Sequence, residues 1–243
     1  MNLAGVAVAV VILMACTIVV LRVARVPLSA SATIAVLRGA LQLAVVSTLI
    51  GVALTHDLAA VLVLVVMLGT AVFTAAHRLR EFSGALWAVA LAIASGAAVT
   101  LVVVFATGAF DFSPRYLLAF SGIVIGGAMT TASTAGRQLW LGMVHRSDEI
   151  EGWLALGATP RRAVSDIGRA AVAEALRPSI DQTKTTGLVT LPGAFVGALL
   201  AGASPVDAGV FQVTVLAGLL AAGSISSTLT VWVLGAPKVL PAR

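Results

Sequence analysis

Long apolar stretches with almost no charge are the feature that most restricts the fold of this 243-residue chain. A helix that crosses the hydrocarbon core of a bilayer needs about 20 mostly apolar residues, because that core is roughly 30 Å thick. The sequence therefore predicts an all-α, polytopic transmembrane helical bundle of about seven spans. The windows that meet the requirement are Leu3–Leu21, Thr33–Leu54, Leu58–Ala76, Ala85–Thr107, Leu117–Ala135, Thr185–Ala201 and Gly209–Leu234.

The composition excludes a soluble enzyme. Only 10% of the residues are charged and 60% are apolar, whereas a soluble domain carries about 25% charged residues to solvate its surface. The lone cysteine, Cys16, lies inside the first apolar window, so the sequence contains no disulfide framework. Neither an internal repeat nor a low-complexity linker divides the chain, and we expect residues 1–243 to form a single transmembrane domain.

The distribution of Lys and Arg predicts the orientation in the membrane. Basic residues follow the first, third, fifth and seventh windows, whereas the opposite loops carry Asp57, Asp111 and Asp207, with Arg115 as their only basic residue. Cytoplasmic loops are enriched in Lys and Arg, so we expect the N-terminus outside and the C-terminus in the cytoplasm of a cell (inner) membrane protein. The net charge of +5 then reflects topology, and no nucleic-acid partner is expected.

The only long polar stretch, residues 136–184, is expected to be a cytoplasmic excursion between spans five and six. Asp148 and Glu151 have the spacing of a capping box at the start of a short helix. Gly157 would end this helix at its C′ position. From periodicity alone, a solvated amphipathic loop and a docking element that transmits force are both possible interpretations.

A second helix is predicted immediately after the first. Thr159 can cap it and Pro160 suits its first position, and we expect it to run to Arg177, where Pro178 disturbs it. We expect an i,i+4 ion pair between Arg162 and Asp166 to stabilise this helix. An apolar stripe of Val164, Ile167 and Ala171 would form its packing face.

The run E-G-W-L-A-L-G-A-T-P from Glu151 to Pro160 resembles the E-A-A-x-x-x-G coupling loop of ABC-transporter permeases. The Glu and Gly keep the separation of that motif, while Gly152 and Trp153 replace its two alanines. A longer stretch, from Glu149 to about Pro205, resembles the iron-export ABC permease family (FetB-like), which is related to plant aluminium-tolerance permeases.

This resemblance implies a homodimer of the permease that works with separate cytoplasmic ABC ATPase subunits. It also implies that the ATPase-coupling residues are Glu151, Gly157, Ala158, Thr159, Pro160 and Arg161. The residues independently support a separate ATPase, because neither Lys184 nor Lys238 lies in a G-x-x-x-x-G-K-[ST] phosphate loop. We therefore expect no cofactor in this chain, and ATP and Mg on the partner subunit.

Polar residues inside the predicted spans suggest a translocation pathway. An Arg near a helix centre costs about 2.5–3.5 kcal/mol on the insertion scale, so Arg38, with Gln42 four residues later, either lines the pathway or snorkels to the membrane surface. The small residues Gly122, Gly126, Thr130 and Thr134 of span five favour helix packing. The candidates for the pathway are Arg38, Gln42, Met129, Thr130, Ser133 and Pro192, the last being a mid-span proline that frees a backbone carbonyl.

No metal site is predicted, because the spans lack His, Asp and Glu away from their ends, and His56, His77 and His145 are scattered over loops. The leading hypothesis is a non-enzymatic permease subunit of an ATP-driven ABC transporter that exports iron or a related metal ion. An ABC importer permease for another small solute is the first alternative. The second is a non-ABC seven-span protein, although a retinal protein would need a Schiff-base Lys in its last span, which this chain lacks.

Overall fold

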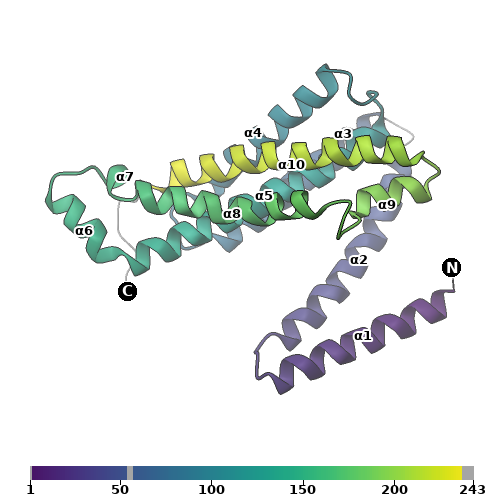
Figure 1. The fold of residues 1–243 in the computed structure, drawn as a ribbon, viewed down its shortest axis with the longest axis horizontal. Helices are drawn as coiled ribbons and strands as arrows, with labels where there is room; N and C mark the ends of the chain where they lie inside the picture. Colours follow the sequence, from purple (N-terminus) through teal and green to yellow (C-terminus); the bar gives the residue numbers. More distant parts are fainter. Residues whose placement is uncertain (1, 54–56, 237–243) are drawn as a thin grey trace. The chain divides into compact units, whose positions relative to one another are not determined.

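The computed structural model describes residues 2–53 and 57–236, which form helices joined by short connections (Figure 1). No strand occurs in these two segments, apart from an isolated bridge between Thr186 and Thr190. The predicted all-α class is therefore confirmed. The helices are α1 (Leu3–Val23), α2 (Ser29–Ala53), α3 (Asp57–Arg78), α4 (Ala85–Ala106), α5 (Pro114–His145), α6 (Ser147–Ala155), α7 (Pro160–Ala163), α8 (Ser165–Thr185), α9 (Gly193–Leu200) and α10 (Pro205–Leu234).

Six of the described helices, α1 to α5 and α10, are long and apolar enough to cross a membrane. They match six of the seven predicted windows, and the chain is a multi-pass membrane protein. Leu54, the predicted end of the second window, lies outside the described residues.

The sixth window, 185–201, is not one continuous helix, so that prediction is wrong. Instead α8 ends at Thr185, residues 186–192 are non-helical, and α9 starts at Gly193. Two residues explain the break. Gly187 has a φ of 86°, which is outside the right-handed helical region, and Pro192, the N-cap of α9, has no backbone N–H to continue a helix.

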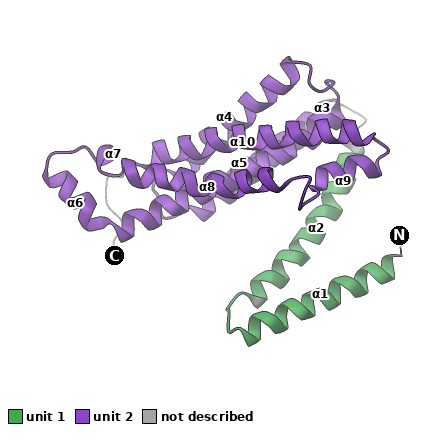
Figure 2. Cartoon of the chain, viewed as in Figure 1, with its two compact units in different colours: residues 1–59 green, residues 60–243 purple. Residues whose placement is uncertain are grey.

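The chain divides into two compact units, residues 1–59 and 60–243 (Figure 2). In the first unit α1 packs against α2, and long apolar side chains such as Val11, Leu13, Leu37 and Leu41 remain exposed along both helices. Such surfaces suit contact with lipid rather than water. The single-domain expectation for residues 1–243 stays a prediction.

In the second unit α10 is the central helix and packs against α4, α5, α8 and α9. Large buried side chains such as Ile93, Phe120 and Leu139 fill the core. Glycines allow the close approach between helices: a Cβ on Gly127 would lie 2.3 Å from Cδ2 of Leu219. Small residues at contact positions let transmembrane helices pack tightly.

Contacts between helices set the directions of the chain. Gly127 of α5 contacts Leu219 of α10, and Thr131, four residues later, contacts Gly223, also four residues later. The helices α5 and α10 are therefore parallel. The chain must return between them, and α8 provides the first part of this return, since Gly142 of α5 meets Ile167 near the start of α8.

The helix α9 completes the return. A cavity of about 450 Å³ is lined by Arg115 at the start of α5, Ala198 of α9 and Asp207 at the start of α10. These three segments consequently lie at the same end of the unit, opposite to the end where α8 begins. The chain thus returns between α5 and α10 through a broken element, made of α8, residues 186–192 and α9.

This arrangement changes the boundaries of the expected excursion, 136–184. Its first ten residues belong to α5, and α8 packs against both α5 and α10. The reason is that Ile167, Ala171 and Ala175 form a buried apolar face on α8, so this otherwise polar helix gains by packing on the bundle. Only residues 146–164, with α6 and α7, connect the long helices.

Candidate coupling hairpin and translocation residues

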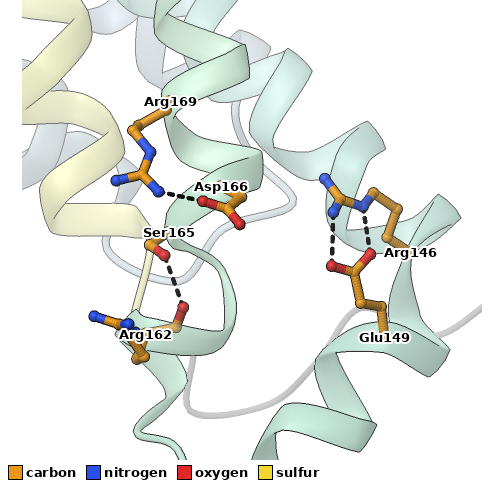
Figure 3. Close-up of polar contacts among 6 residues, drawn as sticks. All are labelled: Arg146, Glu149, Arg162, Ser165, Asp166 and Arg169. Carbon is orange, nitrogen blue, oxygen red and sulfur yellow. Dashed lines mark hydrogen bonds and ion pairs between the residues drawn. The ribbon is translucent and has the colours of Figure 1, made fainter.

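The candidate coupling hairpin, residues 146–164, begins with a bidentate ion pair. Nε and Nη2 of Arg146 each donate a hydrogen bond of 2.7 Å to the carboxylate of Glu149 (Figure 3). This hydrogen bonding lowers the pKa of Glu149 below its ordinary value and raises that of Arg146. The helix α6 starts at Ser147 with Arg146 as its N-cap, so the predicted start at a capping box of Asp148 and Glu151 is wrong.

The predicted end of the first helix is confirmed. Gly157 has a φ of 87°, and its N–H donates to the carbonyl of Leu154 at 2.9 Å, while the N–H of Ala158 donates to that of Trp153 at 3.0 Å. These two bonds define a Schellman motif, in which a left-handed C′ residue closes the helix. Only glycine adopts this conformation at no steric cost.

The start of the second helix, α7, is also as predicted. The hydroxyl of Thr159 accepts a hydrogen bond from the N–H of Arg162 at 3.4 Å, with Pro160 at the first helical position. However, α7 is only four residues long, and a new helix, α8, starts at Ser165.

The predicted ion pair between Arg162 and Asp166 is wrong. The break at Val164 separates these residues into two helices, which removes the i,i+4 geometry. Asp166 instead pairs with Arg169, and the hydroxyl of Ser165 donates to the carbonyl of Arg162 at 2.9 Å (Figure 3). The helix also does not end at Arg177 as expected, because α8 continues through Pro178 to Thr185.

The hairpin is anchored at its base and exposed at its tip. The predicted stripe of Val164, Ile167 and Ala171 is buried at 4% exposure or less, which confirms it as the packing face. At the tip, Leu156 is 82% exposed and Trp153 43% exposed. Glu151 is exposed beside them. Trp153 and Leu156 thus leave a small apolar surface uncovered at the tip of the hairpin.

A contact joins the hairpin to the central helix. The guanidinium of Arg161 lies over the ring of Trp232 on α10, 4.3 Å from the ring centroid. This geometry is that of a cation–π interaction. The hairpin is therefore in direct contact with α10.

The predicted translocation residues are divided between the two units, and we describe each group within its own unit. Arg38 and Gln42 are exposed on α2, in the first unit. Pro192 caps α9 and is not in mid-helix as expected. These three assignments to a pathway stay predictions.

The three candidates on α5 lie near one another, but their polar groups bond within the helix. Thr130 is exposed and its hydroxyl donates to the carbonyl of Gly126 at 3.0 Å. Ser133 is buried and donates to the carbonyl of Met129, which is partly buried, at 2.7 Å. A Cβ on Gly126 would meet nothing within 4 Å, so the contacts within the second unit do not use Gly126, and the expected packing through Gly126 and Thr130 stays a prediction.

A charged face on α8 is the feature that sequence reasoning missed. Nε of Arg177 lies 3.2 Å from Glu174, and Nζ of Lys184 lies 3.1 Å from Asp181. All four side chains are at least 50% exposed. The available signal was the repeat of an i,i+3 charge pair after seven residues, which places both pairs on one helix face. Among the described residues, no group of three or more His, Cys, Asp or Glu is arranged to hold a metal.

Comparison with known proteins agrees with the sequence resemblance. A family model described as "Uncharacterised protein family (UPF0014)" matches residues 4–237. The UPF0014 membrane protein STAR2 of Oryza sativa subsp. japonica is 35% identical over 200 residues, which cover 82% of this chain and 70% of that protein.

Two further relatives carry names that describe a phenotype or an activity. Protein ALUMINUM SENSITIVE 3 of Arabidopsis thaliana is 34% identical over 169 residues, or 68% of this chain and 62% of that protein. The "probable iron export permease protein FetB" of Escherichia coli (strain K12) is 31% identical over 194 residues, or 79% of this chain and 75% of that protein. No solved structure matches the chain. The chain is a member of the UPF0014 family of membrane proteins.

Proposed function

We propose that this chain is the permease subunit of an ATP-driven ABC transporter that exports iron or a related metal ion. The substrate and direction come from the relative named as an iron export permease. The observation that carries the ATP-driven mechanism is the coupling hairpin, whose two caps hold Leu156 exposed at the tip while Arg161 contacts α10.

The proposed partner is a cytoplasmic ABC ATPase subunit that receives the hairpin tip in a groove. ATP and Mg would bind to that subunit, because this chain has no phosphate loop. A transporter of this kind needs two permease halves, and we propose that a homodimer of this chain supplies them. The hairpin would then lie in the cytoplasm, with the N-terminus outside and the C-terminus inside, as the distribution of Lys and Arg indicates.

The test uses proteoliposomes of defined orientation that contain the permease and its ATPase. ATP-driven Fe²⁺ flux and co-purification of the two subunits are measured for the wild type, Glu151→Ala and Leu156→Asp. We expect both variants to lose most of the flux and of the bound ATPase. The matched control is Glu81→Ala, which removes an exposed acid from the α3–α4 connection and should leave both quantities unchanged.

Unchanged flux in both hairpin variants would contradict the coupling role of the hairpin. Inward flux that requires a substrate-binding protein would support the importer alternative instead. Dimer formation is checked separately, from the mass of the purified permease.

A further inference from the structure

The register between α8 and α10 shows how deep the charged face of α8 lies. Gly168 of α8 contacts Val231 of α10. Leu176, eight residues further along α8, contacts Gly223, which precedes Val231 by eight residues on α10. The two helices are therefore antiparallel and in constant register. Extension of this register places Asp181 level with Gly218 and Lys184 level with Val215.

The membrane-embedded part of α10 can be bounded from its sequence. No charged residue occurs between Asp207 and Lys238, and α10 ends at Leu234. The bilayer core takes about 20 residues of a helix, and every such stretch within 208–234 includes residues 215–227. On α8 these positions are level with residues 172–184, so Glu174, Arg177, Asp181 and Lys184 all lie at the depth of the hydrocarbon core.

Lipid cannot cover these four side chains. Their exposed fractions are 50% and 66% for Glu174 and Arg177, and 67% and 69% for Asp181 and Lys184. Ionisable residues at this depth face water or protein, because hydrocarbon does not solvate charge. The opposite side of α8, with Ala171 and Ala175, is already buried in the unit.

The backbone that follows α8 is a second feature of this face. Residues 186–192 are non-helical and begin directly after the stretch that the register places in the hydrocarbon core, so their carbonyl groups need partners wherever the segment enters the bilayer. Such segments occur inside membranes only where they are buried in protein or line a water-filled cavity. Here Leu188 is 91% exposed and Thr190 is exposed, so the segment is not buried in its own unit.

We propose that the charged face of α8, with Glu174, Arg177, Asp181 and Lys184, lines a water-filled pathway through the membrane. This inference rests on the proposed function, for which it supplies the route of a hydrated metal cation. Each acid is paired with a base three residues away, so the wall has no net charge and does not trap the ion. The carboxylate oxygens are ligands that divalent metal ions accept in passing.

The test is the reactivity of single cysteines with a charged, membrane-impermeant methanethiosulfonate reagent. The sole native cysteine is first removed by Cys16→Ala. Ala173→Cys and Ile180→Cys then place thiols beside the charged face, within residues 172–184, and leave both ion pairs intact. We expect both thiols to react in proteoliposomes.

Two controls set the scale of reactivity. Ala155→Cys on the exposed hairpin should react fully. Val102→Cys lies on α4, at the same depth as the charged face, because its neighbour Thr100 contacts Gly218. Val102 is 65% exposed on an apolar helix, and this thiol should react at least tenfold more slowly than those on α8.

The inference is overturned if the α8 thiols react no faster than the thiol of Val102→Cys while that of Ala155→Cys reacts. That result would mean that the face is packed dry against protein and does not line water. Labelling needs neither ATPase nor metal. Reactive thiols without ATP-driven flux would therefore contradict only the proposed function, and flux with unreactive thiols would contradict only the pathway.

Discussion

The hydroxyl of Ser226 on α10 donates a hydrogen bond of 3.1 Å to the backbone carbonyl of Ala92 on α4. The hydrogen bond joins residues far apart in the sequence, and it forms where the backbones of the two helices come close together. Gly96 permits this approach, because a Cβ at that position would lie 2.7 Å from the carbonyl oxygen of Ala222 and 2.4 Å from Oγ of Ser226.

We therefore expect Gly96→Ala to destabilise the second unit by about 1–3 kcal/mol, the usual effect of overpacking. Backbone atoms cannot move aside as a flexible side chain can. The measurement is the thermal unfolding midpoint of the purified protein in detergent. Gly126→Ala is the control, since its Cβ would meet nothing within 4 Å. An equal decrease in both variants would contradict the close approach of α4 and α10.

Gly157→Ala should destabilise the coupling hairpin by about 1 kcal/mol, because a Cβ is strained in the left-handed conformation. Hydrogen exchange of the α6 amides should become faster. Gly152→Ala lies within α6 and should have the opposite effect, a gain of roughly 0.5–1 kcal/mol from the lower entropy of the unfolded chain. If Gly157→Ala leaves exchange unchanged, the Schellman motif does not hold the tip.

The contact between Arg161 and Trp232 should appear as a coupling energy in a double-mutant cycle. Arg161→Ala and Trp232→Leu each remove the cation–π interaction, which contributes roughly 0.5–1 kcal/mol at exposed sites. The double variant should therefore be more stable than the sum of the single effects predicts. Strict additivity of the three unfolding free energies would show that the two side chains act independently.

The ion pair of Arg146 and Glu149 predicts a pH dependence at the start of α6. The hydrogen bond from Arg146 lowers the pKa of Glu149 in the folded protein, so the pair stabilises the helix fully above the ordinary pKa of a glutamate. This contribution disappears as the pH falls through the lowered value. No change in the stability of α6 is expected between pH 6 and 8, because pH 6 is already roughly two units above the ordinary pKa of a glutamate.

A carboxyl ¹³C titration of Glu149 measures this shift directly. Arg146→Ala should raise the pKa of Glu149 toward its ordinary value, because the strongest interaction with the carboxylate is lost. High salt should reduce the shift in the wild type only partly, since the hydrogen bonds are direct. A titration curve that does not respond to Arg146→Ala would show that another group lowers the pKa of Glu149.

Much of the hairpin could be predicted from the sequence because its geometry is local. Gly157, Thr159 and Pro160 each act through backbone groups within a few residues, and all three lie where the pattern placed them. The prediction of an ion pair between Arg162 and Asp166 was wrong because it required both residues to lie in one continuous helix. The break between α7 and α8 at Val164 was not visible in the sequence, and it placed the two residues in different helices.

Hydropathy by itself determined that this chain spans a membrane, because about 20 consecutive apolar residues have no other stable surroundings. It also located six of the crossing helices. Only the tertiary structure decided that α8, a polar helix, packs along α10, in a register that sets Asp181 and Lys184 level with the apolar middle of α10. Average hydropathy cannot distinguish a helix in water from one with a single buried face, since that difference depends on which helices it contacts.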